Sequence, residues 1–95
     1  MISQRHKDLA EWYIFVMREM TGIDPMAKGR QREYVLARAV IAHCLEMEGC
    51  PLVNIARLLE KNHSTIVYYR GRFETIFTPG NDAEREFWEK FKNEI

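Results

Sequence analysis

Apolar side chains recur at three- and four-residue steps along nearly the whole chain, and glycine or proline interrupts the pattern at intervals. This spacing places the apolar side chains on one face of an α-helix, and glycine and proline are the residues that most readily end a helix. No segment makes a convincing β-strand. The pattern therefore predicts an all-α fold, with helices over about residues 3–20, 30–47, 51–59, 62–77 and 82–94.

The length and the apolar content predict a single domain. The chain has 95 residues, of which 46% are hydrophobic, which is enough for one modest core over residues 1–95. Between the first two helices, Asp24 and Pro25 are typical of the start of a short helical turn, and Gly29 is typical of its end. The expected architecture is a small helical bundle of about five helices.

Nothing in the chain suggests export or membrane insertion. Charges interrupt residues 1–12, and no run approaches the roughly 20 apolar residues that a membrane span needs. Neither the number nor the spacing of Cys44 and Cys50 suggests a disulfide framework, and Cys44 lies among apolar residues, where a thiol packs as a small hydrophobe. We therefore expect no membrane partner, and a cytoplasmic protein with reduced thiols.

Charge is unevenly distributed along the chain, although 14 basic and 14 acidic side chains give a formal net charge of zero. Residues 28–38 carry four basic side chains against one acidic one, and residues 57–74 carry four against two. Residues 82–95 carry three basic side chains against five acidic ones. The sequence thus has two basic segments and an acidic last helix, and a basic segment is the part suited to a polyanionic partner.

Residues 51–77 have the pattern of a binding element. A short helix, a turn of about three residues and a longer helix make a helix-turn-helix of the Trp-repressor-like kind, in which the small Ala56 lets the two helices approach closely. The spacing in the longer helix directs four side chains to the core, namely Ile66, Tyr69, Phe73 and Ile76. The outward face then carries His63, Ser64, Thr65, Tyr68 and Arg72.

This outward face has the chemistry of a DNA recognition helix. Such a helix enters the major groove by its N-terminal end, so its first turns must offer donors, acceptors and methyl groups to base edges. Four consecutive residues supply these groups, Asn62 to Thr65, and Tyr68 and Arg72 lie further along to reach phosphates. A plainer interpretation, in which Asn62 is a helix cap and the next residues are ordinary first-turn side chains, stays open at this point.

The basic segment "KGRQR", residues 28–32, is a second candidate for DNA contact. An arginine-bearing loop beside a recognition helix can enter the minor groove, where the potential is most negative. The alternative is a solvated helix start. However, cations at a helix N-terminus oppose the helix dipole, and a nearby polyanion would relieve that conflict.

Two stretches, "AKGRQREYVLARAV" and "PLVNIARLLEKNHSTIVYYRGRF", resemble the C-terminal DNA-binding domain (domain IV) of the bacterial replication initiator DnaA. The similarity spans nearly the whole chain. It implies that Arg30 enters the minor groove with Lys28 and Arg32 flanking it, and that the run from Asn62 to Thr65 touches base edges in the major groove. It also implies that Lys61 takes the place of a family arginine, and that Leu52 lies near a backbone contact.

The sequence departs from the family pattern at reading positions. Asn62 replaces an aspartate, which adds hydrogen-bond donors, and Ser64 lacks the methyl group of the family's threonine. Glu46 or Met47 stands about where the family has a phosphate-contacting lysine, and Pro51 replaces a serine. The DNA sequence that the family binds at replication origins is therefore not assumed to be the target of this protein.

The function expected from the sequence is sequence-specific binding of double-stranded DNA, in replication initiation or transcription regulation, by a nucleoid-associated protein. No GxxxxGK[ST] loop is present, so no ATPase module lies in this chain, and the start at Met1 favours a stand-alone protein over a piece of a complete initiator. We expect no enzyme, cofactor or metal site, because His43, Cys44, Cys50 and His63 match no common zinc spacing and no nucleophile–base set is recognisable.

One alternative is a protein-interaction module that kept the fold without DNA binding. Aromatic side chains are concentrated in the first and last helices, and such stripes are usually core. In a domain this small some of them can remain exposed, which makes a homodimer or another protein partner a further expectation.

Overall fold

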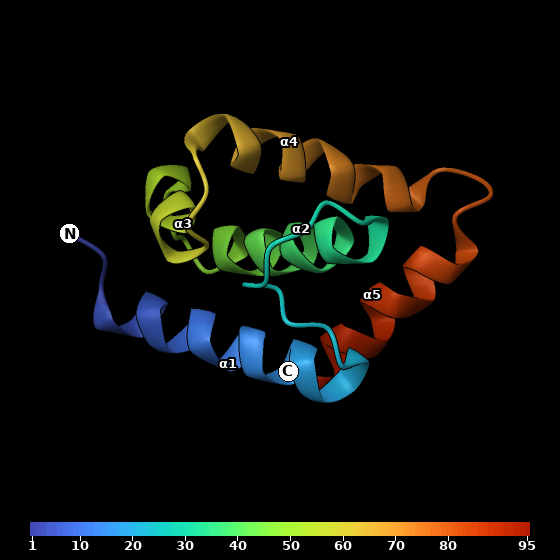
Figure 1. The fold of residues 1–95 in the computed structure, drawn as a ribbon, viewed down its shortest axis with the longest axis horizontal. Helices are drawn as coiled ribbons and strands as arrows, with labels where there is room; N and C mark the ends of the chain where they lie inside the picture. The colour runs from blue at the N-terminus through green and yellow to red at the C-terminus, as the bar shows by residue number, and fades with distance from the viewer.

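The computed structural model describes residues 1–95, which fold into five α-helices and one short 3₁₀ helix, with no strand (Figure 1). The elements are α1 (Gln4–Thr21), α2 (Arg32–Met47), α3 (Leu52–Leu58), α4 (His63–Glu74), η1 (Thr75–Phe77) and α5 (Asp82–Glu94). The predicted all-α bundle is confirmed, and every observed helix boundary except the end of α4 lies within two residues of the expected one. Only the end of the fourth helix differs in type, because its last three residues form the 3₁₀ helix η1.

Helix α2 is the centre of the molecule. It lies between α1 and α4, and it also packs against α3, so that most of its surface is covered by other helices (Figure 1). A helix covered in this way must be apolar nearly all round, and Val40, Ile41 and Leu45 of α2 are fully buried. Met17 of α1 and Phe91 of α5 complete the same core.

Helices α2 and α3 end in the same hydrogen-bonded motif. After α2, Gly49 adopts a left-handed φ of 86°, and the Cys50 N–H donates to the Leu45 carbonyl at 3.0 Å. After α3, the Lys61 N–H donates to the Ala56 carbonyl at 2.8 Å, and Glu60 takes the left-handed position with φ 57°. These are Schellman motifs, which satisfy the last carbonyls of a helix and reverse the chain sharply. The second one sets the angle at which α4 leaves α3.

Residues 24–29 begin with a single hydrogen-bonded turn capped by Asp24, as the sequence predicts, and continue as a loop. The Asp24 carboxylate accepts from the Met26 N–H at 3.0 Å, and the Ala27 N–H donates to the Asp24 carbonyl at 3.0 Å, but no helix follows. The carbonyls that would continue a helix instead accept hydrogen bonds from the side chain of Arg38. Because α2 begins only at Arg32, the loop continues beyond residue 29 and contains both Lys28 and Arg30. It is called the basic loop below.

Both cysteines are buried and free. Burial raises the pKa of the Cys44 thiol to about 12 and also raises the pKa of Cys50. Cys44 therefore packs as a small hydrophobe, as the sequence predicts. No helix of the fold combines the length and the apolar content needed to cross a bilayer.

Candidate nucleic-acid interface

Arg38 shapes the basic loop. Its side chain is almost fully buried, with 2% of the residue exposed. The guanidinium donates to the Pro25 carbonyl at 2.8 Å, to the Gly29 carbonyl at 2.8 Å and also to the Ala27 carbonyl. A buried cation is tolerated only when its donors are satisfied, and here the loop backbone satisfies them. Arg38 thereby holds the loop in one conformation.

The first turn of α4 is organised by Asn62. The side-chain oxygen of Asn62 accepts from the Thr65 N–H at 2.8 Å and from the Thr65 hydroxyl at 2.9 Å. This is an N-cap, which satisfies a backbone donor at the helix start. His63 and Ser64 are exposed between these two residues. The plainer interpretation of Asn62 as a cap is therefore correct for its oxygen, and its amide nitrogen remains on the exposed surface.

The basic loop and the start of α4 share one groove, here called the loop–α4 groove. It has a volume of about 570 Å³. Its lining comes from the loop (Lys28, Gly29, Arg30), from α2 (Val35, Arg38) and from the turn and α4 (Lys61, Thr65, Tyr68, Tyr69). Four of these residues are cations, and none is acidic. Two segments about thirty residues apart in the chain thus form a single basic surface.

The positive charge in this groove has no carboxylate beside it. Lys28, Arg30 and Lys61 take part in none of the protein's ion pairs. Several other arginines are instead paired with carboxylates, as Arg70 is with Glu46, whose nitrogen and oxygen lie 2.7 Å apart. A chain with no net charge therefore concentrates unbalanced positive charge at one place, which attracts an anion.

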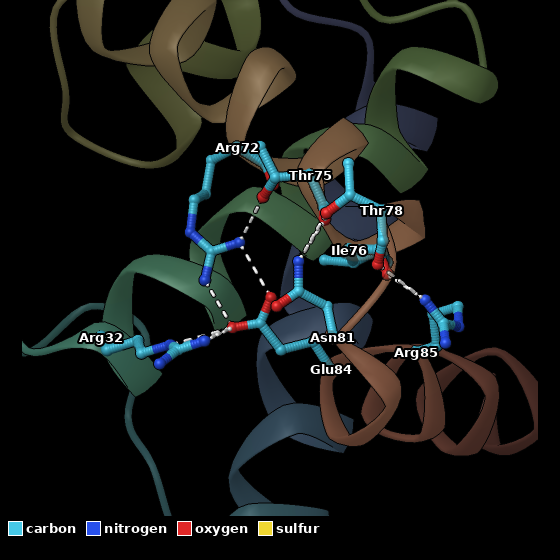
Figure 2. Close-up of polar contacts among 8 residues, drawn as sticks. All are labelled: Arg32, Arg72, Thr75, Ile76, Thr78, Asn81, Glu84 and Arg85. Carbon is cyan, nitrogen blue, oxygen red and sulfur yellow. Dashed lines mark hydrogen bonds and ion pairs between the residues drawn. The ribbon is translucent and has the colours of Figure 1, made fainter.

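Arg72 and Arg32 do not belong to this groove. Both bind Glu84 of α5, as Figure 2 shows, with nitrogen–oxygen distances of 2.6 Å for Arg72 and 2.8 Å for Arg32. The Arg72 side chain is only 15% exposed, and it also donates to the Thr75 hydroxyl at 2.7 Å. The prediction that Arg72 points outward is therefore wrong, because α5 folds back and places a carboxylate between the two guanidinium groups.

The Glu84 cluster fixes the position of α5. Hydrogen bonds from Arg72, followed by those from Arg32, hold the pKa of Glu84 below its usual range. The adjacent corner is tied by Asn81, whose amide donates to the Thr75 carbonyl at 2.7 Å, and by Arg85, which donates to the Ile76 carbonyl at 3.1 Å (Figure 2). Arg32 and Arg72 are therefore structural in this fold, although the Arg32 side chain remains 72% exposed.

The other predicted site residues divide into three groups. Asn62, His63 and Ser64 are exposed at the start of α4, outside the groove lining. Lys28, Arg30, Lys61, Thr65 and Tyr68 line the loop–α4 groove together. Leu52 is half-buried at the start of α3 and packs against the core, outside the groove lining. The sequence analysis missed the role of Arg38. The signal for it was an arginine inside an otherwise apolar stretch, "VLARAVIA", where a charge needs a dedicated set of partners.

No family model, curated protein or solved structure matches the chain. The charge and the geometry of the loop–α4 groove are therefore the grounds for assigning a function.

Proposed function

We propose that the protein binds double-stranded DNA, with the start of α4 in the major groove and the loop of Lys28 and Arg30 in the neighbouring minor groove. The observation that carries this proposal is the loop–α4 groove, which is lined by four cations and no carboxylate. A phosphate backbone separates the major groove from the minor groove of a duplex. The loop–α4 groove lies between the loop and the start of α4, so cations from both sides would face the phosphate backbone that passes between these two grooves of the DNA.

The start of α4 supports a role in reading bases. Asn62, His63 and Ser64 are all exposed and lie at the first turn, the part of a recognition helix that meets base edges. They offer an amide, an imidazole and a hydroxyl, which can hydrogen-bond to the major-groove edges of base pairs. Tyr68, one turn further along and 59% exposed, is placed to contact a phosphate.

The loop supports a role in the minor groove. Arg38 holds its backbone through three carbonyls, so that the side chains of Lys28 and Arg30 project from a fixed base. A loop that is already ordered loses less conformational entropy on binding than a flexible one. An arginine from such a loop is well suited to a narrow minor groove with enhanced negative potential.

The resemblance of the sequence to the DnaA C-terminal domain supports the same assignment and suggests the process. A helix-turn-helix protein of this kind would act in replication initiation or transcription regulation, in the cytoplasm at the nucleoid. Because Asn62 and Ser64 differ from the family pattern at reading positions, we expect a target sequence different from the family's.

A salt titration of binding to a mixed-sequence duplex tests the proposal. Affinity should fall steeply with salt, because each neutralised phosphate releases counterions. Arg30→Ala and Lys61→Ala should each weaken binding and reduce the slope of log affinity against log salt by about 1. Fluorescence anisotropy of a labelled duplex measures both quantities.

Lys7→Ala is the matched control, because Lys7 is an exposed lysine of α1 outside the groove. It should leave the slope unchanged. An absence of binding at low salt, or an equal effect of the Lys7 and Lys61 variants, would overturn the proposal. In the first case the alternative of a protein-interaction module would replace it.

A further inference from the structure

Arg38 lies at the floor of the loop–α4 groove and faces both of its walls. Its three guanidinium nitrogens all donate to carbonyls of the basic loop. On the other side it lines the groove together with Tyr69 of α4, which is also buried. Burial raises the pKa of the Tyr69 hydroxyl, and the nearby charge of Arg38 opposes that shift. One buried side chain of α2 thus supports the basic loop and adjoins α4.

Gly29 fastens the loop at a second point. It has a φ of 149°, a backbone conformation that side chains rarely adopt. A Cβ atom at this position would lie 3.0 Å from the ring of Tyr34 and would also meet the side chain of Gln31. The Arg38 guanidinium lies over the same Tyr34 ring, 5.8 Å from its centroid. The loop backbone therefore packs closely on α2, and only glycine allows this approach.

We propose that Arg38 is a positioning residue that fixes the spacing between the two DNA segments that the protein reads. The bases contacted by α4 and the minor groove entered by the basic loop must then lie at one separation along the duplex. This inference rests on the proposed function and deepens it. Arg38 itself binds no phosphate, because all three of its nitrogens already donate to the loop.

The geometry of a duplex makes such a fixed spacing selective. A duplex turns once in about ten base pairs, so one inserted base pair rotates the two segments by about 35° and separates them by about 3.4 Å. A flexible arm would follow this displacement, whereas a loop fastened by Arg38 and Gly29 cannot. The charges of Lys28 and Arg30 do not depend on the loop conformation. Fixed spacing therefore affects sequence-specific affinity and leaves the general attraction to DNA unchanged.

The mechanical part of the proposal is testable without DNA. Backbone order parameters of residues 26–30, measured by NMR relaxation, should be near the rigid value of about 0.85 in the wild type. In Arg38→Met and in Gly29→Ala they should fall toward about 0.6. Gly80→Ala is the matched control, because Gly80 also has a positive φ, of 93°, but lies in the turn before α5 with no neighbour near its Cβ position. It should leave the loop as rigid as in the wild type.

The spacing itself is tested on DNA. Selection from random duplexes and footprinting define the preferred site and its major-groove and minor-groove parts, and one base pair is then inserted between these parts. The wild type and Gly80→Ala should lose at least about tenfold in affinity for the lengthened site, as for a lost base contact. Arg38→Met and Gly29→Ala should bind the original site more weakly and lose less than about threefold on insertion.

A charge-neutral variant separates positioning from electrostatics. Gly29→Ala changes no charge, so it should leave the slope of log affinity against log salt for a mixed-sequence duplex unchanged. A wild type that binds DNA but tolerates the insertion would overturn this inference alone. So would a loop that stays rigid in Arg38→Met, or an equal loss on insertion in the wild type and both loop variants. An absence of DNA binding would overturn the proposed function and this inference together.

Discussion

At the scale of single residues, Asn62 combines a structural and a proposed functional role in one side chain. Its oxygen is already bonded to the N–H and the hydroxyl of Thr65. The group left for a base edge is the amide nitrogen, which is a donor only. If α4 reads DNA, Asn62 should therefore prefer an acceptor in the major groove, such as O6 or N7 of guanine.

Asn62→Asp separates the two roles. Aspartate caps a helix as well as asparagine does, so the free energy of unfolding should change by no more than about 0.5 kcal/mol. The second carboxylate oxygen is an acceptor, so the preferred base at one position should change to one that presents a donor, such as cytosine. Selection from random duplexes with both proteins measures this change, and identical preferred sequences would mean that Asn62 is a cap alone.

At the scale of elements, the turn between α3 and α4 contains a conformational strain. Glu60 is the only non-glycine residue with a positive φ, and it occupies the left-handed position of a Schellman motif that glycine normally fills. The same position after α2 is held by Gly49. The turn orients α4, and it keeps this conformation at the expense of some stability.

Glu60→Gly should relieve that strain. We expect the free energy of unfolding to rise by about 1 kcal/mol, because a side chain in the left-handed region costs roughly that much. Chemical denaturation measures this change in the free energy of unfolding. Glu86→Gly, in the interior of α5, is the control and should lower the free energy of unfolding by about 1 kcal/mol. A loss of stability in both variants would show that Glu60 is not strained.

At the scale of the whole molecule, His43 joins three helices. Its ring stacks on Phe73 of α4 with centroids 3.8 Å apart, and it meets the edge of Trp88 of α5 at 5.4 Å. Burial lowers the pKa of His43, while the nearby Glu46 opposes the shift. The neutral imidazole is therefore the form that the assembled bundle favours.

This predicts how stability depends on pH. In the unfolded chain His43 takes up a proton near pH 6.5, whereas in the folded protein it does so only at lower pH. The stabilisation is therefore complete above pH 6.5 and should be lost progressively as pH falls below 6.5. In His43→Phe, the midpoint of chemical denaturation should depend less on pH below pH 6.5 than it does in the wild type. His63→Gln, at an exposed position, should keep the pH dependence of the wild type. An equal pH dependence of the midpoint in all three proteins would contradict the assignment of this effect to His43.

Local patterns explain why the helices were predictable. Apolar spacing and glycine or proline breaks act over a few residues, so they are readable in the sequence. The Asp24 turn was readable for the same reason, but the conformation of the loop was not, because its carbonyls accept hydrogen bonds from Arg38 on α2. Its local sequence carries no sign of that partner.

The sequence by itself determined the number and order of the helices, the buried faces and the two basic segments. Only the tertiary structure decided which cations remain without a carboxylate. Glu84 binds Arg72, twelve residues earlier, and Arg32, fifty-two residues earlier, whereas Lys28, Arg30 and Lys61 converge on one groove with no acid in its lining. Helix formation depends on neighbours in the chain, but the pairing of charges depends on which helices pack together.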